Sequence, residues 1–120
     1  MIEIYVYKNR DNPVIVELVA EAREGAAVEP DPPLQSATKV TLKTDNSIEL
    51  DTDNDPDRLE MLDDTRLEMV LGPEFADVDY GLRGYLSVFY SDTPNGVAWP
   101  GHANDPDEAT FLFIPVPWPS

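Results

Sequence analysis

The side chains in this chain that could do chemistry are mostly carboxylates, and the densest group alternates along one short segment. This group consists of Asp51, Asp53, Asp55 and Asp57. A Ca²⁺ loop uses oxygen ligands at this spacing, because they must converge on a hard cation. Compared with an EF-hand loop, however, the sixth position is Pro56 instead of glycine, and the twelfth is Leu62 instead of glutamate. The run therefore predicts either a Ca²⁺ site or, as charge runs more often do, a solvated acidic loop.

The other chemical signals are less specific. His102 is the only histidine, and the chain has no cysteine, so a zinc site would have to be completed by carboxylates. Ser91 and Asp92 could complete a triad with it, but no sequence resembling a nucleophile elbow surrounds a serine. With 24 acidic residues, some pair at the spacing of a general acid and base occurs by chance. We therefore expect a protein that is not an enzyme and has no cofactor, with Ca²⁺ as the one cation to test.

Composition narrows the class of partner. The 120 residues include 24 Asp and Glu against 8 Lys and Arg, which gives a net charge of −16. Binding to nucleic acid needs cations to replace counterions, and anionic membranes attract basic segments, so neither is expected as a partner. Hydrophobic residues make up 42% of the chain, enough for a core, and the length suits one domain over residues 1–120. The first residues lack the pattern of a secretory signal, so we do not expect secretion through a signal peptide.

The elements that must position these side chains are strands, because the dominant hydrophobic period is two. Near the start, Ile2, Ile4 and Val6 alternate with Glu3, Tyr5 and Tyr7. Further strands are predicted over residues 37–43, 48–50, 66–71 and 84–91. The first two of these form a hairpin, and a turn is predicted over residues 93–96. About seven or eight short strands and no helix predict an antiparallel sandwich or small barrel.

Prolines mark the end of the chain. Pro115, Pro117 and Pro119 occupy every second position, so an extended strand would lack donors along one side. This predicts a proline-rich edge strand or tail over residues 115–120. Two roles are open: protection of an exposed edge against aggregation, and a stiff tail that docks its Trp118 on a neighbouring subunit.

Aromatic side chains lie on the faces predicted to point outward. They are Tyr5, Tyr7, Phe89, Trp99 and Trp118. They could form a second buried face within a sandwich or a protein interface, where Tyr and Trp are enriched. The candidate interface therefore consists of Tyr5, Tyr7, Trp99, Pro115, Pro117 and Trp118.

Three runs resemble structural proteins of tailed phages and prophages that have an immunoglobulin-like β-sandwich. They are residues 67–72, residues 84–90 and the hairpin pattern of residues 94–99, and the chain is similar to the N-terminal domains of phage baseplate upper proteins. The resemblance implies an immunoglobulin-like fold and a structural role in a tail, baseplate, neck or decoration. It also implies assembly in the host cytoplasm, with other virion proteins or a second copy as partners, and no catalytic residues.

Two other functions are open. An acidic protein can mimic DNA and inhibit a nucleic-acid-binding protein, provided that its carboxylates are spaced like phosphates on a rigid surface. A Ca²⁺-binding β module is the third possibility.

The charge also predicts how the fold responds to salt. Three lysines against fourteen aspartates suggest a source rich in salt, where screening relieves repulsion between carboxylates. We expect the melting temperature to rise between dilute buffer and molar NaCl. A thermal scan at both concentrations tests this, and an unchanged or lower melting temperature in NaCl would contradict it.

Overall fold

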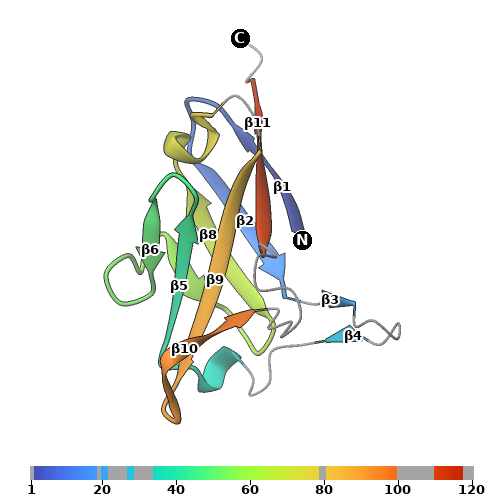
Figure 1. The fold of residues 1–120 in the computed structure, drawn as a ribbon. Helices are drawn as coiled ribbons and strands as arrows, with labels where there is room; N and C mark the ends of the chain where they lie inside the picture. The colour runs from blue at the N-terminus through green and yellow to red at the C-terminus, as the bar shows by residue number, and fades with distance from the viewer. Residues whose placement is uncertain are drawn as a thin grey trace.

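Two β-sheets packed face to face form the body of the protein in a computed structural model (Figure 1). The structure describes residues 2–18, 20–21, 27–28, 34–78, 81–99 and 110–117. The larger sheet has the order β1 (Ile2–Tyr7), β11 (Phe111–Val116), β9 (Leu82–Tyr90), β5 (Lys39–Thr44) and β6 (Glu49–Asp51), and β10 (Thr93–Trp99) also pairs with β9. The smaller sheet has the order β2 (Asn12–Glu17), β8 (Arg66–Leu71) and β7 (Leu59–Met61).

Short elements complete the described part of the chain. The pair β3 (Ala20–Glu21) and β4 (Ala27–Val28) forms a small ribbon of its own. Two single 3₁₀ turns, η1 (Leu34–Ser36) and η2 (Pro73–Ala76), connect strands. No helix in these residues is long and apolar enough to cross a lipid bilayer.

The distribution of the strands is that of an immunoglobulin-like sandwich. In chain order, β2, β7 and β8 form one sheet, while β5, β6, β9 and β11 form the other. This is how strands B, D and E separate from strands C, C′, F and G in that fold. The predicted all-β sandwich is confirmed. The two sheets contain nine strands, and β1 runs parallel to β11 although the other pairs are antiparallel.

The period-two pattern determines which side chains form the core. Alternate residues of each strand point between the sheets, as pleating requires. Phe113 of β11 and Phe75 of η2 meet edge to face with ring centroids 5.2 Å apart, and Phe111 lies 5.7 Å from Phe113. All three side chains are fully buried. The aromatic cluster therefore joins the last strand to the connection between β8 and β9.

The predicted edge position of the last strand is wrong for the start of β11 and correct for Pro115 and Val116, which pair on one side only. β11 lies inside the larger sheet, with β1 on one side and β9 on the other. The pairing with β9 covers only Phe111–Phe113, before the prolines, whereas the pairing with β1 continues to Val116. The prolines therefore limit pairing only on the side of β9. The apolar start of the strand pairs with both β1 and β9.

The hairpin predictions have mixed outcomes. β5 and β6 pair in antiparallel register as predicted, with Leu42 opposite Leu50. The turn predicted over residues 93–96 is wrong, because β9 and β10 are joined at Ser91 and Asp92, and Thr93 already pairs with Tyr90. The register shifts between Thr93 and Val97, and Gly96 adopts a φ of +82°. Pro94 and Gly96 thus shape an irregular strand instead of the turn itself.

Candidate protein interaction surface

The outer face of the larger sheet carries a row of aromatic and aliphatic side chains. Register places Tyr5 of β1 beside Ile114 of β11, and Tyr7 beside Val116. Their neighbours in sequence, Ile4, Val6 and Phe113, point into the core and are buried. The outward row therefore comes from the same alternation that builds the core.

Tyr5 and Tyr7 do not form a second buried face. Tyr5 is 62% exposed and Tyr7 is 39% exposed, among the largest values for apolar side chains in the described residues. Leu112, Ile114 and Val116 lie beside them and are partly buried. The first of the two interpretations of these aromatics is thus excluded for both tyrosines, which lie on the surface of the sandwich.

Charge on this face is balanced, although the chain as a whole is strongly acidic. By register, the cations Lys39, Lys43 and Arg83 lie on the outer face. The carboxylates of Glu3, Glu49 and Asp51 share it. Within the described strands, this face therefore carries three basic and three acidic residues, whereas the whole chain has 8 basic and 24 acidic residues. The exposed tyrosines of this face are of the kind in which protein interfaces are enriched.

Local contacts hold the basic side chains in place. The Nζ atom of Lys39 lies 4.5 Å from the ring centre of Phe89, in cation–π geometry. The Lys43 ammonium lies 4.0 Å from the Glu49 carboxylate. A Cβ at Gly96 would come within 2.9 Å of the Phe89 ring, so this glycine leaves room for the ring. The face is thus ordered by its own side chains.

The remaining candidate interface residues have different positions. Pro115 belongs to β11 opposite Val6 and is partly buried, so it is part of the sheet and not of a free tail. Pro117 follows the strand and is exposed. The backbone of Trp99 pairs with Leu86 at the end of β10. Trp118 lies outside the described residues, and so does His102.

The alternating aspartates bind their own backbone. The Asp51 carboxylate accepts hydrogen bonds from the N–H groups of Asp53 (2.9 Å) and Asn54 (2.6 Å). The Asn54 N–H, together with its side-chain amide, holds the pKa of Asp51 below its ordinary value. The Asp55 carboxylate accepts from the Asp51 N–H at 3.1 Å, while the Asp55 N–H donates to the Asp51 carbonyl at 2.8 Å. These bonds close the loop, and they occupy the N–H and the carbonyl of Asp51 on the free side of β6.

The four aspartates do not form a metal centre in the structure. Asp53 and Asp57 are exposed, and the described residues contain no group of three or more metal-ligating side chains that converge. Because Asp51 and Asp55 are oriented by amide donors, their oxygens point to the backbone and not to a common point. The solvated loop is the interpretation that the geometry supports.

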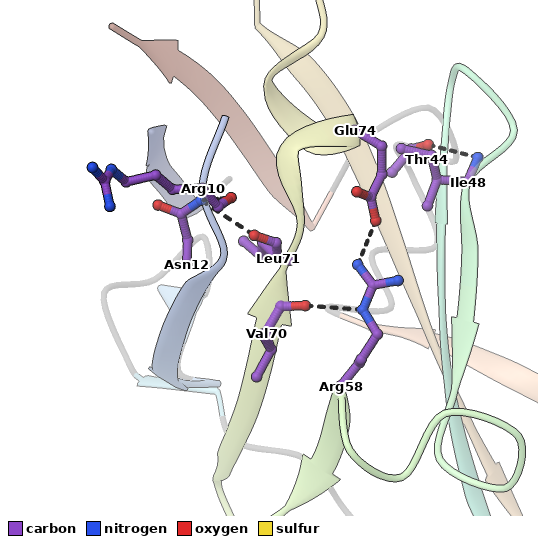
Figure 2. Close-up of polar contacts among 8 residues, drawn as sticks. All are labelled: Arg10, Asn12, Thr44, Ile48, Arg58, Val70, Leu71 and Glu74. Atoms are coloured by element: carbon purple, nitrogen blue, oxygen red, sulfur yellow. Dashed lines mark hydrogen bonds and ion pairs between the residues drawn. The ribbon is translucent and has the colours of Figure 1, made fainter. Parts of the chain in front are cut away.

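Asn12 is a structural residue that the sequence analysis does not single out. It is 8% exposed, and its side chain makes four hydrogen bonds that join both sheets. Its Oδ1 accepts from the Tyr7 N–H at 3.0 Å, and its Nδ2 donates to the carbonyls of Tyr7, Arg10 and Leu71 at 3.1–3.2 Å. Figure 2 shows the bond to the carbonyl of Leu71. The only local signal is that Asn12 precedes Pro13, a dipeptide typical of turns.

Arg58 and Glu74 form a second polar link, between the start of β7 and η2 (Figure 2). Arg58 donates to the Glu74 carboxylate through Nη2 and to the Val70 carbonyl through Nε at 3.4 Å. Partial burial raises the pKa of Glu74, but the hydrogen bond from Arg58, a backbone hydrogen bond and the Arg58 charge together outweigh it, so the net effect is a pKa below the ordinary value.

The Arg58–Glu74 link predicts a loss of stability in acid. A carboxyl whose pKa is lower in the folded than in the unfolded state stabilises the fold above the unfolded pKa. This stabilisation disappears as the pH falls through the folded pKa, so we expect it to decline below about pH 4.5. Because both side chains are more than one-third exposed, solvent screening keeps it under about 1 kcal/mol. Urea unfolding between pH 3 and pH 7 should show a smaller decline for Glu74→Gln than for the wild type, and parallel curves would contradict this.

One depression of about 430 Å³ lies at the same end of the sandwich. Its lining consists of Lys8, Asn9, Pro73, Glu74, Ala76 and Asp77. Of its charged groups, Glu74 is already bound to Arg58. The depression therefore offers a polar surface but no arrangement that identifies a reaction.

The chain has no identifiable relative in the comparisons with known proteins. No family model matches it, and neither the curated proteins nor the solved structures contain a significant match.

Proposed function

We propose that this protein is a non-enzymatic structural or assembly component of a tailed-phage or prophage virion. It acts through protein–protein contacts made by the outer face of the larger sheet. The observation that carries this proposal is the exposure of Tyr5 and Tyr7 beside the aliphatic row of β11, on a charge-balanced face of an acidic chain. Assembly takes place in the host cytoplasm, and the protein then remains in the tail, baseplate, neck or decoration.

Two features of the face favour a protein partner. Tyrosine supplies large contact area at a low entropic cost, and interfaces are enriched in it. Carboxylates of a partner can pair with three cations of this face, Lys39, Lys43 and Arg83. The face therefore offers apolar contact together with charged groups that fix the register of a partner.

The alternative functions receive less support from the geometry. A DNA mimic needs rows of carboxylates on a rigid surface, but the outer face of the larger sheet intersperses three cations among its carboxylates. A Ca²⁺ module needs converging oxygens, and Asp51 and Asp55 instead bind backbone amides.

Coexpression with neighbouring gene products tests the proposal. The affinity-tagged chain is expressed together with the products of the genes that flank its own, and captured proteins are identified by mass spectrometry. We expect a tail or head component to be captured by the wild type and by Ile15→Ala, which changes an apolar side chain 57% exposed on the smaller sheet. Capture should fall at least about tenfold for Tyr5→Ala/Tyr7→Ala. Equal capture by all three chains, or no capture, would overturn the proposal.

A further inference from the structure

The free edges of the two sheets differ in how well they are protected. An edge strand presents unpaired N–H and C=O groups to any passing strand, and natural proteins usually block them. In the described residues, free sides occur on β1, β6 and β10 of the larger sheet and on β2 and β7 of the smaller one. Figure 1 shows β1 at one end of the larger sheet, beside β11.

Three of these five edges, those of β6, β7 and β10, are short, closed or irregular. β7 is only three residues long. Pro13 removes one donor from the free side of β2, but Ile15 and Glu17 on the same side have no partner there within the described residues. On β6, also three residues long, Asp55 binds both the N–H and the carbonyl of Asp51. β10 contains Pro94 and a shift of register. β6, β7 and β10 therefore offer no regular row, whereas β2 keeps two open positions and is the alternative edge that a variant at Ile15 must separate from β1.

The direction of the peptide groups in β1 follows from two hydrogen bonds. The N–H of Ile2 donates to Thr110 and the N–H of Lys8 donates to Val116, both at 2.9 Å. In a parallel pair only alternate residues bond to a given neighbour, so the even-numbered residues of β1 face β11. The peptide groups of Glu3, Tyr5 and Tyr7 therefore face the free side.

Asn12 closes only one of these three positions. Its side chain accepts from the Tyr7 N–H and donates to the Tyr7 carbonyl. Glu3 and Tyr5 have no such partner on this side within the described residues. The open part of the edge consequently consists of two adjacent donor–acceptor pairs, centred on Ile4.

We propose that this edge pairs with the same edge of a second copy, in antiparallel register with Ile4 opposite Ile4 of the other copy. Glu3 then lies opposite Tyr5 of the second copy, and Tyr5 opposite its Glu3. Each pair exchanges two hydrogen bonds, so all four open donors and all four open acceptors of the two copies are used. Because Asn12 occupies Tyr7, a longer register is blocked, and the two-fold arrangement satisfies the edge completely.

Charge is compatible with this register and predicts its salt dependence. No two glutamates face each other directly, which avoids the like-charge pairs that destabilise a sheet. Two copies that each carry a charge of −16 still repel at long range, and molar salt shortens that range to about 3 Å. We therefore expect dimers in molar NaCl and dissociation in dilute buffer. The inference rests on the proposed function as an assembly protein and names a second copy as one partner.

Sedimentation and light scattering of the full chain test the pairing in 1 M NaCl at increasing protein concentration. We expect twice the chain mass for the wild type. Glu3→Pro removes only a donor on the free side, as Pro13 does on β2, and should raise the dissociation constant at least about tenfold. The matched control, Ile15→Pro, changes the free side of β2, and Tyr5→Ala keeps its backbone donor; both should dimerise like the wild type. A wild-type monomer, or a Glu3→Pro dimer of unchanged strength, would overturn the inference.

Cross-linking gives a second test that does not depend on proline. The chain has no cysteine, and residues in a hydrogen-bonded antiparallel pair have Cα atoms about 5.5 Å apart, within the range of a disulfide. With oxidised glutathione, Glu3→Cys/Tyr5→Cys should become a covalent dimer, whereas each single variant should not. Equal cross-linking of single and double variants would contradict the register.

The two proposals can fail separately. If the isolated chain stays monomeric but captures a flanking gene product through Tyr5 and Tyr7, the second-copy inference is wrong and the proposed function stands. If Glu3→Pro abolishes that capture while the chain is monomeric, the edge takes a strand from a different protein, and the second-copy inference is again overturned.

Discussion

Replacing Phe113 with alanine should lower the free energy of unfolding by about 3–5 kcal/mol, the usual cost of removing a large buried aromatic side chain. Phe113 is fully buried and contacts the rings of both Phe75 and Phe111. Its loss leaves a cavity between β11 and η2, which the interior of the sheet cannot fill by collapse. Domains of this size are stable by only about 5–15 kcal/mol, so the variant should lose a large part of its stability.

Urea unfolding at fixed NaCl concentration measures this effect. Tyr5→Ala is the matched control, because it removes a ring of similar size from the outer face of the neighbouring strand, where 62% of the side chain is exposed. We expect it to cost less than about 1 kcal/mol. Similar losses for both variants would mean that the two faces of the larger sheet are assigned incorrectly.

Gly84 provides an independent check of the same contact. A Cβ at this position would lie 2.6 Å from Cε2 of Phe113 and 3.3 Å from Leu42. The ring therefore occupies the space that a side chain at Gly84 would need. In a double-mutant cycle, Gly84→Ala should cost less in the Phe113→Ala background than in the wild type.

Replacing Asn12 with alanine should destabilise the protein by about 3 kcal/mol. The change removes four side-chain hydrogen bonds, among them those to the N–H of Tyr7 and the carbonyl of Leu71. Each buried polar group left unpaired costs about 1–3 kcal/mol, and water can reach those nearer the surface. Because the bonds join β1, the turn after it and β8, both sheets should separate more easily at this end.

Asn12→Asp distinguishes hydrogen bonding from packing. Aspartate has nearly the same shape as asparagine, but it replaces the donor Nδ2 with an acceptor that faces three carbonyl oxygens. Thermal and urea unfolding near neutral pH should therefore show a loss at least as large as for Asn12→Ala. Wild-type stability of Asn12→Asp would show that the side-chain donor is unimportant.

Local pattern was sufficient to assign faces. The alternation of Ile4 and Val6 with Tyr5 and Tyr7 predicts which side chains are buried, and the structure confirms it. The strand over residues 66–71 and the hairpin of β5 and β6 are confirmed for the same reason. Pleating sends successive side chains to opposite faces whatever the partner strand is, so this information is present in each segment alone.

The roles of polar side chains could not be predicted in this way. Asp51, Asp53, Asp55 and Asp57 have the spacing of cation ligands, but Asp51 and Asp55 bind backbone N–H groups in the loop. Asn12 has the appearance of a turn residue, yet one of its partners, Leu71, lies 59 residues away. A carboxylate or amide binds whichever donor or acceptor is nearest, and that depends on the folded loop and on distant strands.

The sequence by itself determined most of the strands, their buried faces, the net charge and the donors that prolines remove, but it placed a turn where β10 begins. Only the tertiary structure decided which strands are neighbours. β11 lies between β1 and β9, and it pairs with β9 only at its start, before the prolines. It also decided that the Asn12 side chain binds the peptide groups of Tyr7, but not those of Glu3 and Tyr5, on the free side of β1. The physical reason is the range of the interactions, because pleating is set by adjacent residues, whereas pairing joins segments that are distant in the chain and depends on the whole core.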